Sequence, residues 1–456
     1  MTTLHVREAL LPAGWARDVR IEIAAGRISS LVTGVGPNPG DERHAAMVPA
    51  VANLHSHAFQ RGMAGLAEIR GPNHDTFWTW RDVMYRFALA MDPDDVEAVA
   101  AQLYVEMLEA GFCRVGEFHY LHHDRDGRPY ADPAELATRI VAAAAGAGIG
   151  LTLLPVFYAH GGFAGAPPTP GPRRFITDPD SFATLLTRSR AAARLHPGTV
   201  VGLAPHSLRA VTPTELAAIL PLALADEPIH IHAAEQVREV EDCVAWSGRR
   251  PVEYLLDEAG LDARWCLIHA THMTPDETRR LATSDAVAGL CPLTEASLGD
   301  GVFNGPDFIA AGGRYGVGSD SNVVVGIADE LRQLETAQRL FHRERNVMAT
   351  GEGASTGRCL LQAAVEGGSR ALGAPTEGIA IGAAADLASL DTDHPTFAGR
   401  FGDGLIDSFI FAGRGQLLDC VWVGGMKLVT AGRHKNRDAI AAKFKRTMNR
   451  IADRIA

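Results

Sequence analysis

Two histidines two positions apart, His55 and His57, stand at the end of an apolar run that covers residues 47–54. Alternate side chains of a β-strand point to the same face, so the two imidazoles can bind one metal ion. A lone His-x-His pair carries little information, because two histidines around a serine also arise by chance and often hydrogen-bond locally. The pair predicts a metal site only if other parts of the chain supply further ligands.

Three other apolar runs end in residues that can bind a metal or move a proton: His232, His269 and Asp320. A third imidazole from His232 and a carboxylate from Asp320 would complete a donor set that suits Zn²⁺ or another borderline divalent ion. Iron or manganese would accept the same ligands. Scattered polar residues are the alternative interpretation, and the repeated placement at strand ends counts against it. We predict one divalent metal ion, with Zn²⁺ as the best fit, held by His55, His57, His232 and Asp320.

The residues beside these ligands predict hydrolysis. A divalent ion lowers the pKa of a bound water to about 7, so that the water can act as hydroxide at neutral pH. Asp320 can hold this water and accept its proton, and His269 can orient or deprotonate it. Glu235, one helical turn after His232, can carry a proton to a leaving nitrogen. The predicted catalytic residues are Glu235, His269 and Asp320.

These residues can meet only if their strands end at a common edge. From residue 48 onward, short apolar runs of β type alternate with longer amphipathic patterns, which is typical of βα units on a parallel sheet. Eight such units predict an α/β fold, a (β/α)8 TIM-type barrel over residues 48–370, with functional residues at the carboxyl ends of its strands. The predicted strands are residues 48–54, 113–118, 149–156, 199–205, 228–232, 265–269, 286–291 and 315–319.

The two ends of the chain lack this alternation. Residues 1–47 and 371–456 show short strands joined by turns, and the second segment ends in a basic helix over residues 436–455. Neither end is long enough for a core of its own, so we expect both to pair into one small β-sandwich beside the barrel. The predicted strands of the two ends are residues 4–10, 18–24, 28–32, 387–390, 407–411, 421–423 and 426–430.

Composition excludes several classes of protein. Of 456 residues, 46% are hydrophobic and 21% are charged, as in a globular chain with a large core. The net charge of -11, without a run of Lys and Arg among aromatics, disfavours nucleic acid as a partner. The six cysteines lack C-x-x-C spacing, so they predict neither a disulfide framework nor a thiolate zinc site, and they fit a reducing cytoplasm.

No membrane segment is expected. Residues 1–17 carry scattered charges and lack the apolar core of a secretory signal. Residues 140–159 are uncharged and long enough to cross a bilayer, but the glycines between positions 146 and 150 interrupt a helix. We predict that this stretch contains the end of a helix, a glycine turn and a buried strand.

Other histidines have structural interpretations. His230 lies on the same strand face as His232 but one layer deeper, so a buried, hydrogen-bonded side chain is favoured over a ligand. His119, His122 and His123 follow the second predicted strand. We interpret them as loop and supporting residues, because a second metal ion would need more carboxylates nearby.

The ligand pattern resembles the amidohydrolase superfamily of metal-dependent hydrolases over nearly the whole chain. Residues 378–387 are similar to the C-terminal sandwich of that superfamily. Binuclear members have a bridging carbamylated lysine at the end of strand four, where this chain has Pro205, His206 and Ser207. Together with His232 and Glu235, this difference implies the branch of deaminases that use one metal ion.

Within the superfamily, several phrases resemble the deiminases of N-formimino-L-glutamate. The resemblance implies hydrolysis of that compound to N-formyl-L-glutamate and ammonia in histidine degradation. It also implies a homodimer. The phrases are residues 55–62, 77–81, 117–123, 206–209, 230–236 and 318–321.

Such a substrate has two carboxylates and a cationic formimino head, so its pocket needs cationic donors at one end and anions at the other. Arg209, expected on the loop after strand four, is the best candidate for binding a carboxylate, with His206 and Tyr120 as further donors. A surface salt bridge is the alternative for Arg209.

The resemblance adds Gln60 and Arg81 to the substrate-binding residues. It also allows Arg81 to reach the pocket from a neighbouring subunit. An exposed cation stacked on Trp78 or Trp80 is the alternative interpretation of Arg81.

Three other functions stay open. A deaminase of an aromatic amine, such as guanine or a triazine, would share the metal ligands but would stack its substrate and have little use for Arg209. A binuclear amidase or a dihydroorotase-like enzyme would need the missing lysine. A non-catalytic metal-binding barrel would need neither Glu235 nor His269.

Overall fold

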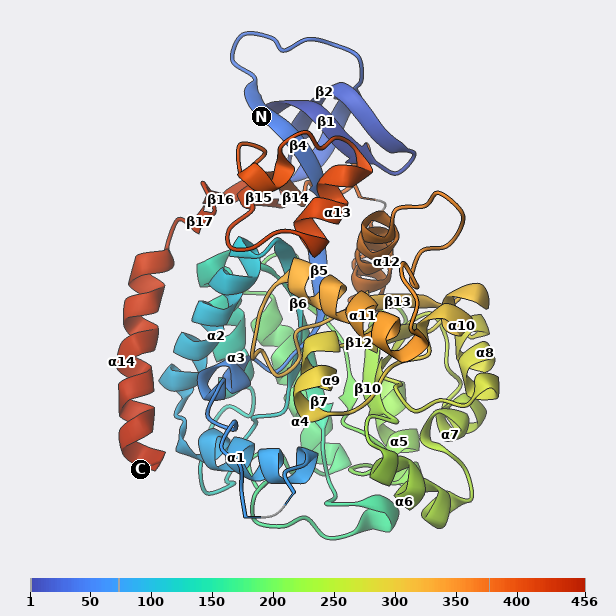
Figure 1. Cartoon of the computed structure of the whole chain (residues 1–456). Coiled ribbons are helices and arrows are strands. Elements are labelled where there is room, and N and C mark those ends of the chain that lie inside the picture. Colours follow the sequence, from blue (N-terminus) through green and yellow to red (C-terminus); the bar gives the residue numbers. More distant parts are fainter. Residues whose placement is uncertain (1, 73, 377, 456) are drawn as a thin grey trace.

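The computed structural model describes residues 2–72, 74–376 and 378–455, and parallel strands covered by helices form its central part (Figure 1). One parallel sheet contains β5 (Val51–Ser56), β6 (Phe112–His119), β7 (Gly150–Phe157) and β8 (Val200–Val201), with β9 (Ala204–Pro205) paired to β7. The other contains β10 (Ile229–Ala233), β11 (Trp265–His269), β12 (Val287–Leu290) and β13 (Arg314–Val317). The predicted strands lie at these places, with differences at the first and the fourth.

The first and fourth predicted strands are each divided in two. Residues 48–49 belong to β4 (Glu42–Pro49) of a third sheet, and the parallel strand β5 begins only at Val51. Between β8 and β9 stands Gly202, where a Cβ would lie 2.4 Å from the carbonyl oxygen of Pro228. The neighbouring backbone comes too close for a side chain at this point, and a pattern along one strand does not reveal such a neighbour.

The outer strands of the two parallel sheets bond to each other on both sides. The Asp320 N–H donates to the His55 carbonyl at 3.0 Å, and the His57 N–H donates to the Asp320 carbonyl at 3.0 Å. On the other side, the His232 N–H donates to the His206 carbonyl at 3.0 Å. These bonds bring the residues that follow β5, β9 and β13 to one edge, together with the end of β10.

Helices lie on the outside of the parallel sheets (Figure 1). Several begin with a capping residue followed by proline, for example Asp92, Asp178 and Thr274. The side chain of such a residue accepts an N–H of the first turn, and proline fixes the helical φ there. The helices of this part are α1 (Phe77–Ala90), α2 (Pro93–Glu109), α3 (Glu135–Ala147), α4 (Pro179–Ala193), α5 (Pro213–Ile219), α6 (Val237–Ser247), α7 (Pro251–Glu258), α8 (Pro275–Thr283), α9 (Pro292–Leu298), α10 (Gly305–Ala310), α11 (Ile327–His342) and α12 (Thr356–Ala371), with short 3-10 segments η1 (Ala58–Met63), η2 (Phe163–Gly165) and η3 (Leu220–Leu222). A further 3-10 segment, η4 (Pro395–Phe397), lies in the C-terminal segment of the chain.

The two ends of the chain form one eight-stranded sheet at one end of the molecule (Figure 1). β4 joins its halves, because it pairs with β1 (Thr2–Leu11) on one side and with β14 (Leu387–Leu390) on the other. The expected pairing of the two ends is present as a single hydrogen-bonded sheet, and a two-layered sandwich stays a prediction. The strand order is β17-β16-β15-β14-β4-β1-β2-β3, with β2 (Gly14–Ala24), β3 (Arg27–Val32), β15 (Leu418–Val423), β16 (Met426–Thr430) and β17 (Arg433–His434).

The strand predicted over residues 407–411 is wrong, because this segment is the last part of a helix, α13 (Asp403–Phe411). Leu405, Ile406, Phe409 and Ile410 are buried, at the spacing of one helical face. A short apolar run fits both the strand and the helix period. Here the segment packs as a helix against α11 and α12.

The basic helix predicted over residues 436–455 is confirmed as α14 (Arg437–Ile455). It starts near the terminal sheet, runs along α2 and reaches α1 at the far end of the molecule (Figure 1). The uncharged stretch of residues 140–159 contains the end of α3, a turn at Gly148 with φ +83° and the strand β7, as predicted. In the part of the chain that the structure describes, no helix combines the length and apolarity that a membrane crossing requires.

Candidate metal centre and active site

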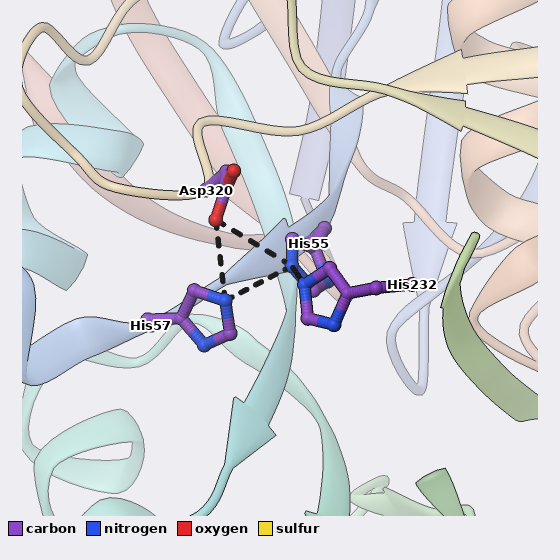
Figure 2. Close-up of side chains that lie close together, drawn as sticks. All are labelled: His55, His57, His232 and Asp320. Atoms are coloured by element: carbon purple, nitrogen blue, oxygen red, sulfur yellow. Dashed lines mark hydrogen bonds and ion pairs between the residues drawn. The ribbon is translucent and has the colours of Figure 1, made fainter. Parts of the chain in front are cut away.

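The four predicted metal ligands lie together at the carboxyl edge of the strands (Figure 2). His55 belongs to β5, His57 follows it directly, His232 belongs to β10 and Asp320 follows β13. The Nε2 atom of His55 is 3.2 Å from Nε2 of His57 and 3.1 Å from Nε2 of His232. The Oδ1 atom of Asp320 is 3.2 Å from Nε2 of His57 and 3.6 Å from Nε2 of His55. Three ring nitrogens and a carboxylate oxygen therefore converge on one point.

The orientation of the rings fits a metal ion at that point. Nδ1 of His57 donates to the carbonyl of Phe118 at 3.1 Å, and Nδ1 of His232 donates to the carbonyl of His206 at 3.0 Å. A neutral ring that donates from Nδ1 carries its lone pair on Nε2, which then faces the shared point. Burial, together with the neighbouring histidines, lowers the pKa of His55 and His232 well below the ordinary value. Neutral imidazoles and one carboxylate around a buried point suit a divalent cation.

Asn322 bonds the ends of β5 and β13 to each other. Its Nδ2 donates to the carbonyls of His57 at 3.0 Å and Asp320 at 2.8 Å. Asp320 and Asn322 have φ values of +44° and +57°, in the left-handed region that residues other than glycine rarely adopt. The side-chain amide of Asn322 thus holds the strained backbone turn that directs Asp320 toward the histidines. The sequence indicates no role for Asn322, whose only signal there is its place two residues after Asp320.

His269 lies between the predicted proton carriers. Its Nε2 is 3.7 Å from an oxygen of Glu235 and 3.7 Å from an oxygen of Asp320, and this nitrogen has no hydrogen-bond partner in the described part of the chain. Nδ1 of His269 lies 3.2 Å from Oε1 of Glu295. Burial would lower the pKa of His269, but the carboxylates of Glu235, Glu295 and Asp320 raise it to about 10. The three predicted catalytic side chains are thus in one constellation.

Buried carboxylates that the sequence analysis did not single out hold the loops around these residues. Glu295 accepts the N–H of Cys291 at 2.9 Å in addition to facing His269. Glu117 accepts the N–H of Ala58 at 2.7 Å, and its burial raises its pKa to about 7. Glu117 bonds to a residue far away in the sequence, and Glu295 bonds to the backbone just before its own helix. Neither contact follows from the period of a strand or a helix, so the sequence pattern could not identify these two carboxylates.

Glu235 is fixed through its backbone and paired through its side chain. The N–H of Glu235 donates to Oε2 of Glu239 at 3.0 Å, and the preceding residue, Ala234, has φ +52°. Nη2 of Arg209 donates to Oε2 of Glu235 at 3.1 Å. Both side chains of this ion pair are buried. Arg209 is therefore not engaged in a surface salt bridge.

Three of the four metal ligands, His57, His232 and Asp320, line a pocket of about 530 Å³, a volume that includes its opening to solvent. All of the predicted substrate-binding residues line it: Gln60, Arg81, Tyr120, His206 and Arg209. Nε2 of Gln60 donates to the Tyr120 hydroxyl at 2.8 Å, while Oε1 of Gln60 is buried and no described residue bonds to it. The remaining wall is aromatic and apolar, with Phe77, Trp80, Met84, Tyr85, Tyr158, Phe175 and Leu298.

Arg81 lies on α1 and lines the pocket of its own chain. Its guanidinium also lies 4.4 Å from the ring centre of Trp78, so the stacked cation weighed as an alternative is present as well. The two arrangements are compatible because a guanidinium can stack through its face and donate through its edge. No neighbouring subunit is needed to bring Arg81 to this pocket.

Three of the four histidines with a predicted structural role, His230, His122 and His123, bond to backbone carbonyls. Nε2 of His230 donates to the carbonyl of Ala371 at 2.7 Å. His122 and His123 donate to the carbonyls of Val156 and Ile176, each at 2.8 Å. His119 is buried nearby and contacts the His122 ring. These residues lie outside the cluster of converging ligand atoms.

Comparison with known proteins agrees with this site. The model of the amidohydrolase family matches residues 46–428, and a model described as the N-terminal domain of formimidoylglutamate deiminase HutF matches residues 1–45. The formimidoylglutamate deiminase of Pseudomonas aeruginosa is 49% identical over 99% of this chain and 100% of its own length.

Solved structures show the same fold. The crystal structure of an amidohydrolase from Brucella melitensis has a TM-score of 0.96 and 58% identity, and the match covers 99% of this chain and 100% of that chain. An adenosine deaminase from Xanthomonas campestris with bound zinc has a TM-score of 0.81 over 99% of this chain and 98% of that chain, at 19% identity. At that identity the second likeness concerns the fold alone.

Proposed function

The chain belongs to the amidohydrolase family, and on this basis we propose that it hydrolyses N-formimino-L-glutamate to N-formyl-L-glutamate and ammonia in histidine degradation. The observation that carries the proposal is one pocket lined by two basic side chains, Arg81 and Arg209, and two acidic ones, Asp320 and Glu235. The substrate has two carboxylates and one cationic head, so each kind of charge finds a partner. The full-length relation to the Pseudomonas aeruginosa deiminase supports the same substrate.

The family is metal-dependent, and we propose a single Zn²⁺ held by His55, His57, His232 and Asp320. The convergence of three Nε2 atoms and one carboxylate oxygen supports this ligand set. When bound, such an ion supplies a Lewis acid that makes water a nucleophile at neutral pH.

Different residues around the metal site carry out the separate proton transfers. We propose that Asp320 accepts a proton from the attacking water while His269 Nε2, between Asp320 and Glu235, holds the water in place. A carbon–oxygen bond forms at the formimino carbon. The proton taken from the water passes on to Glu235, which gives it to the terminal nitrogen of the tetrahedral intermediate. The carbon–nitrogen bond breaks, the hydroxyl of the intermediate loses its proton to Asp320 and becomes the formyl carbonyl, and ammonia leaves.

The opposite part of the pocket binds the glutamate portion of the substrate. Arg209 and Arg81 supply charged donors for the carboxylates, and His206, Tyr120 and Gln60 supply neutral ones. An arginine can donate to a carboxylate through two N–H groups, which fixes the distance between tail and reacting carbon.

The proposal is tested by ammonia release from N-formimino-L-glutamate, with guanine and N-formyl-L-glutamate as comparison substrates. We expect release from the formimino compound only, loss after chelation and return with Zn²⁺. Arg209→Ala should abolish most of the turnover, and the exposed, pocket-remote Arg194→Ala serves as its control. Turnover of guanine without turnover of the formimino compound would overturn the substrate.

The aromatic wall favours one alternative, deamination of a ring amine. Phe77, Trp80, Tyr85 and Phe175 could stack on a planar ring. Arg81 and Arg209 would then have no carboxylate partner in the substrate, which is why we prefer the dicarboxylate. The guanine assay decides between the two.

We also propose the architecture and setting of the enzyme. The bonds between β5 and the Asp320 turn, and between β9 and β10, support closure of the two parallel sheets into a (β/α)8 barrel over residues 48–370. Residues 1–47 and 371–456 would form the accessory unit. We propose a homodimer, for which exposed Leu340 and Phe341 at the end of α11 offer apolar surface, and a cytoplasmic setting, which the six free cysteines support.

A further inference from the structure

The ion pair between Arg209 and Glu235 joins the two residues that the proposed reaction assigns to different ends of the substrate. Nη2 of Arg209 lies 3.1 Å from Oε2 of Glu235, and the pair is buried in the wall of the pocket. The other oxygen of Glu235 lies 3.7 Å from Nε2 of His269. One carboxylate oxygen therefore faces the chemistry, and the other is held by the residue that should bind the substrate tail.

Arg209 has unused donors for a second carboxylate. A guanidinium carries five N–H groups, and here Nε of Arg209 is buried without a hydrogen-bond partner among the residues that the structure describes. A buried donor without a partner is unfavourable, so a ligand that satisfies it is favoured. An incoming carboxylate can thus engage Arg209 and compete with Glu235 for the same guanidinium.

Glu235 can respond by a movement of its side chain alone. Its backbone is fixed, because the N–H groups of Ala234 and Glu235 both donate to the carboxylate of Glu239. The backbone therefore keeps its place when the ion pair opens, and only the carboxylate of Glu235 has to turn toward the reacting nitrogen.

We propose that the carboxylate of the substrate replaces Glu235 on Arg209 and so releases Glu235 for proton transfer to the leaving nitrogen. This inference rests on the proposed function and adds a specificity mechanism to it. Recognition of the tail then controls the rate of the chemical step as well as affinity. Only an interaction that differs between the enzyme–substrate complex and the transition state can alter kcat. A formimino compound without the carboxylate would leave Glu235 paired, however well its head fits.

The test separates the head of the substrate from its tail. Formamidine supplies the head alone, and glutarate supplies the carboxylates without a reacting group. We expect glutarate to accelerate formamidine hydrolysis by the Zn²⁺-loaded native protein by about tenfold or more, the equivalent of one charge-assisted hydrogen bond exchanged. Glutaramide, which has the same chain without charge, should have no effect at matched ionic strength.

Two variants separate pairing from binding. Arg209→Ala should hydrolyse formamidine faster than the native protein without glutarate, and should no longer respond to glutarate. Arg81→Ala should still respond, at a higher glutarate concentration, because Arg81 lines the same pocket and no ion pair with a carboxylate is found for it among residues 2–72, 74–376 and 378–455. The experiment on the native protein needs neither variant to fold.

Each outcome decides the inference. Glutarate that inhibits formamidine hydrolysis, or leaves it unchanged, would overturn the exchange on Arg209 while turnover of N-formimino-L-glutamate keeps the proposed function intact. Slower formamidine hydrolysis by a folded, Zn²⁺-loaded Arg209→Ala would also overturn it, because Arg209 would then position Glu235 rather than withhold it. Absence of turnover of N-formimino-L-glutamate itself would overturn the proposed function.

Discussion

At the scale of single residues, the site depends on carboxylates behind the pocket wall as well as on those that line the pocket. Glu295 illustrates this point. It lies behind His269, with Oε1 at 3.2 Å from Nδ1, and does not line the pocket. A carboxylate at Nδ1 fixes the orientation of the ring, so that Nε2 faces Glu235 and Asp320.

Replacing Glu295 should therefore slow the reaction without weakening substrate binding. We expect Glu295→Gln to lower kcat by about 10- to 100-fold and to leave KM nearly unchanged, because the ring loses its orienting partner. Steady-state kinetics with N-formimino-L-glutamate at saturating Zn²⁺ measures both constants.

Glu330→Gln is the matched control for this variant. Glu330 is buried and accepts the N–H of Leu293 at 3.0 Å in α9, the helix that carries Glu295, but no bond joins it to His269 among the described residues. The Glu330→Gln variant should be less stable than the native protein, without a comparable fall in kcat. An equal loss of kcat in both variants would show that Glu295 acts only by holding the loop.

At the scale of elements, α1 is the part of the pocket wall whose position depends on the C-terminal helix. α1 contributes Phe77, Trp80, Arg81, Met84 and Tyr85 to the pocket. Arg454 of α14 donates to the carbonyl of Ala90 at 2.9 Å, where α1 ends, and pairs with Asp92 at 3.0 Å, where α2 begins. One side chain thus bonds to both sides of the junction between α1 and α2.

Loss of Arg454 should loosen α1 and weaken substrate binding. We expect Arg454→Ala to raise KM by about three- to tenfold with kcat within about twofold, and to speed hydrogen exchange in α1. Because Arg454 is partly exposed, the loss of stability should be only about 1 kcal/mol.

Lys443→Ala is the control for the ion pairs of α14. Lys443 pairs with Glu97 at 2.8 Å on the same helix pair, farther from the end of α1. KM should stay at the native value in this variant. A similar rise of KM in both would assign the effect to α14 as a whole.

The helix α12 packs directly on the backbones of β13 and β5, the strands that meet beside Asp320. Two glycines permit this approach. A Cβ at Gly367 would lie 1.9 Å from the carbonyl oxygen of Tyr315, and a Cβ at Gly368 would lie 2.9 Å from that of Ala52. Side chains at these positions would push the helix away from the strands that position His55 and Asp320.

Gly367→Ala should therefore destabilise the protein by about 3 kcal/mol or more, because the added carbon overlaps fixed backbone atoms. Urea unfolding of the metal-free protein measures the change. The matched control is Gly146→Ala in α3, where no atom lies within 4 Å of the new Cβ. This second change should stabilise by about 0.5–1 kcal/mol, as expected for glycine to alanine in a helix, and destabilisation by both would contradict the packing argument.

At the scale of the whole molecule, buried neutral histidines make stability depend on pH. His119 is an example that lies outside the proposed metal ligands. Burial, with the nearby Arg174 guanidinium, lowers the pKa of His119 to about 3. As pH falls below the ordinary value of 6.5, the unfolded chain binds a proton at this residue and the folded protein does not. The stabilisation present above pH 6.5 is therefore lost as pH falls toward about 3.

The contribution of His119 should be about 2 kcal/mol at pH 5 relative to pH 8. We expect His119→Asn, whose side-chain oxygen can accept the local backbone N–H, to reduce the slope of unfolding free energy against pH between 5 and 6.5 by about one proton. Urea unfolding of the metal-free protein over that range gives the slope. An unchanged slope would mean that His119 is protonated in the folded state.

The strand ends could be predicted from sequence because their signals are local. Apolar runs of a few residues mark β5, β6, β7, β10, β11, β12 and β13, and polar residues directly after them mark one edge of the sheets. A strand places alternate residues on one face whatever surrounds it, so His55 and His57 could be assigned to one site without knowledge of the fold. The segment of residues 407–411 failed because a short apolar run does not distinguish strand from helix without its neighbours.

The sequence by itself determined the metal-ligand candidates, the α/β alternation and the pairing of the two ends, because strand period, strand-end position and residue chemistry are properties of short segments. Tertiary structure alone decided that Arg209 meets Glu235, that Glu295 supports His269, and that α14 reaches the end of α1. Each of these contacts joins separate elements, and its geometry depends on how loops and helices pack around the strands. The sequence pattern determines which side chains lie at the strand ends, and tertiary packing determines which of them come into contact.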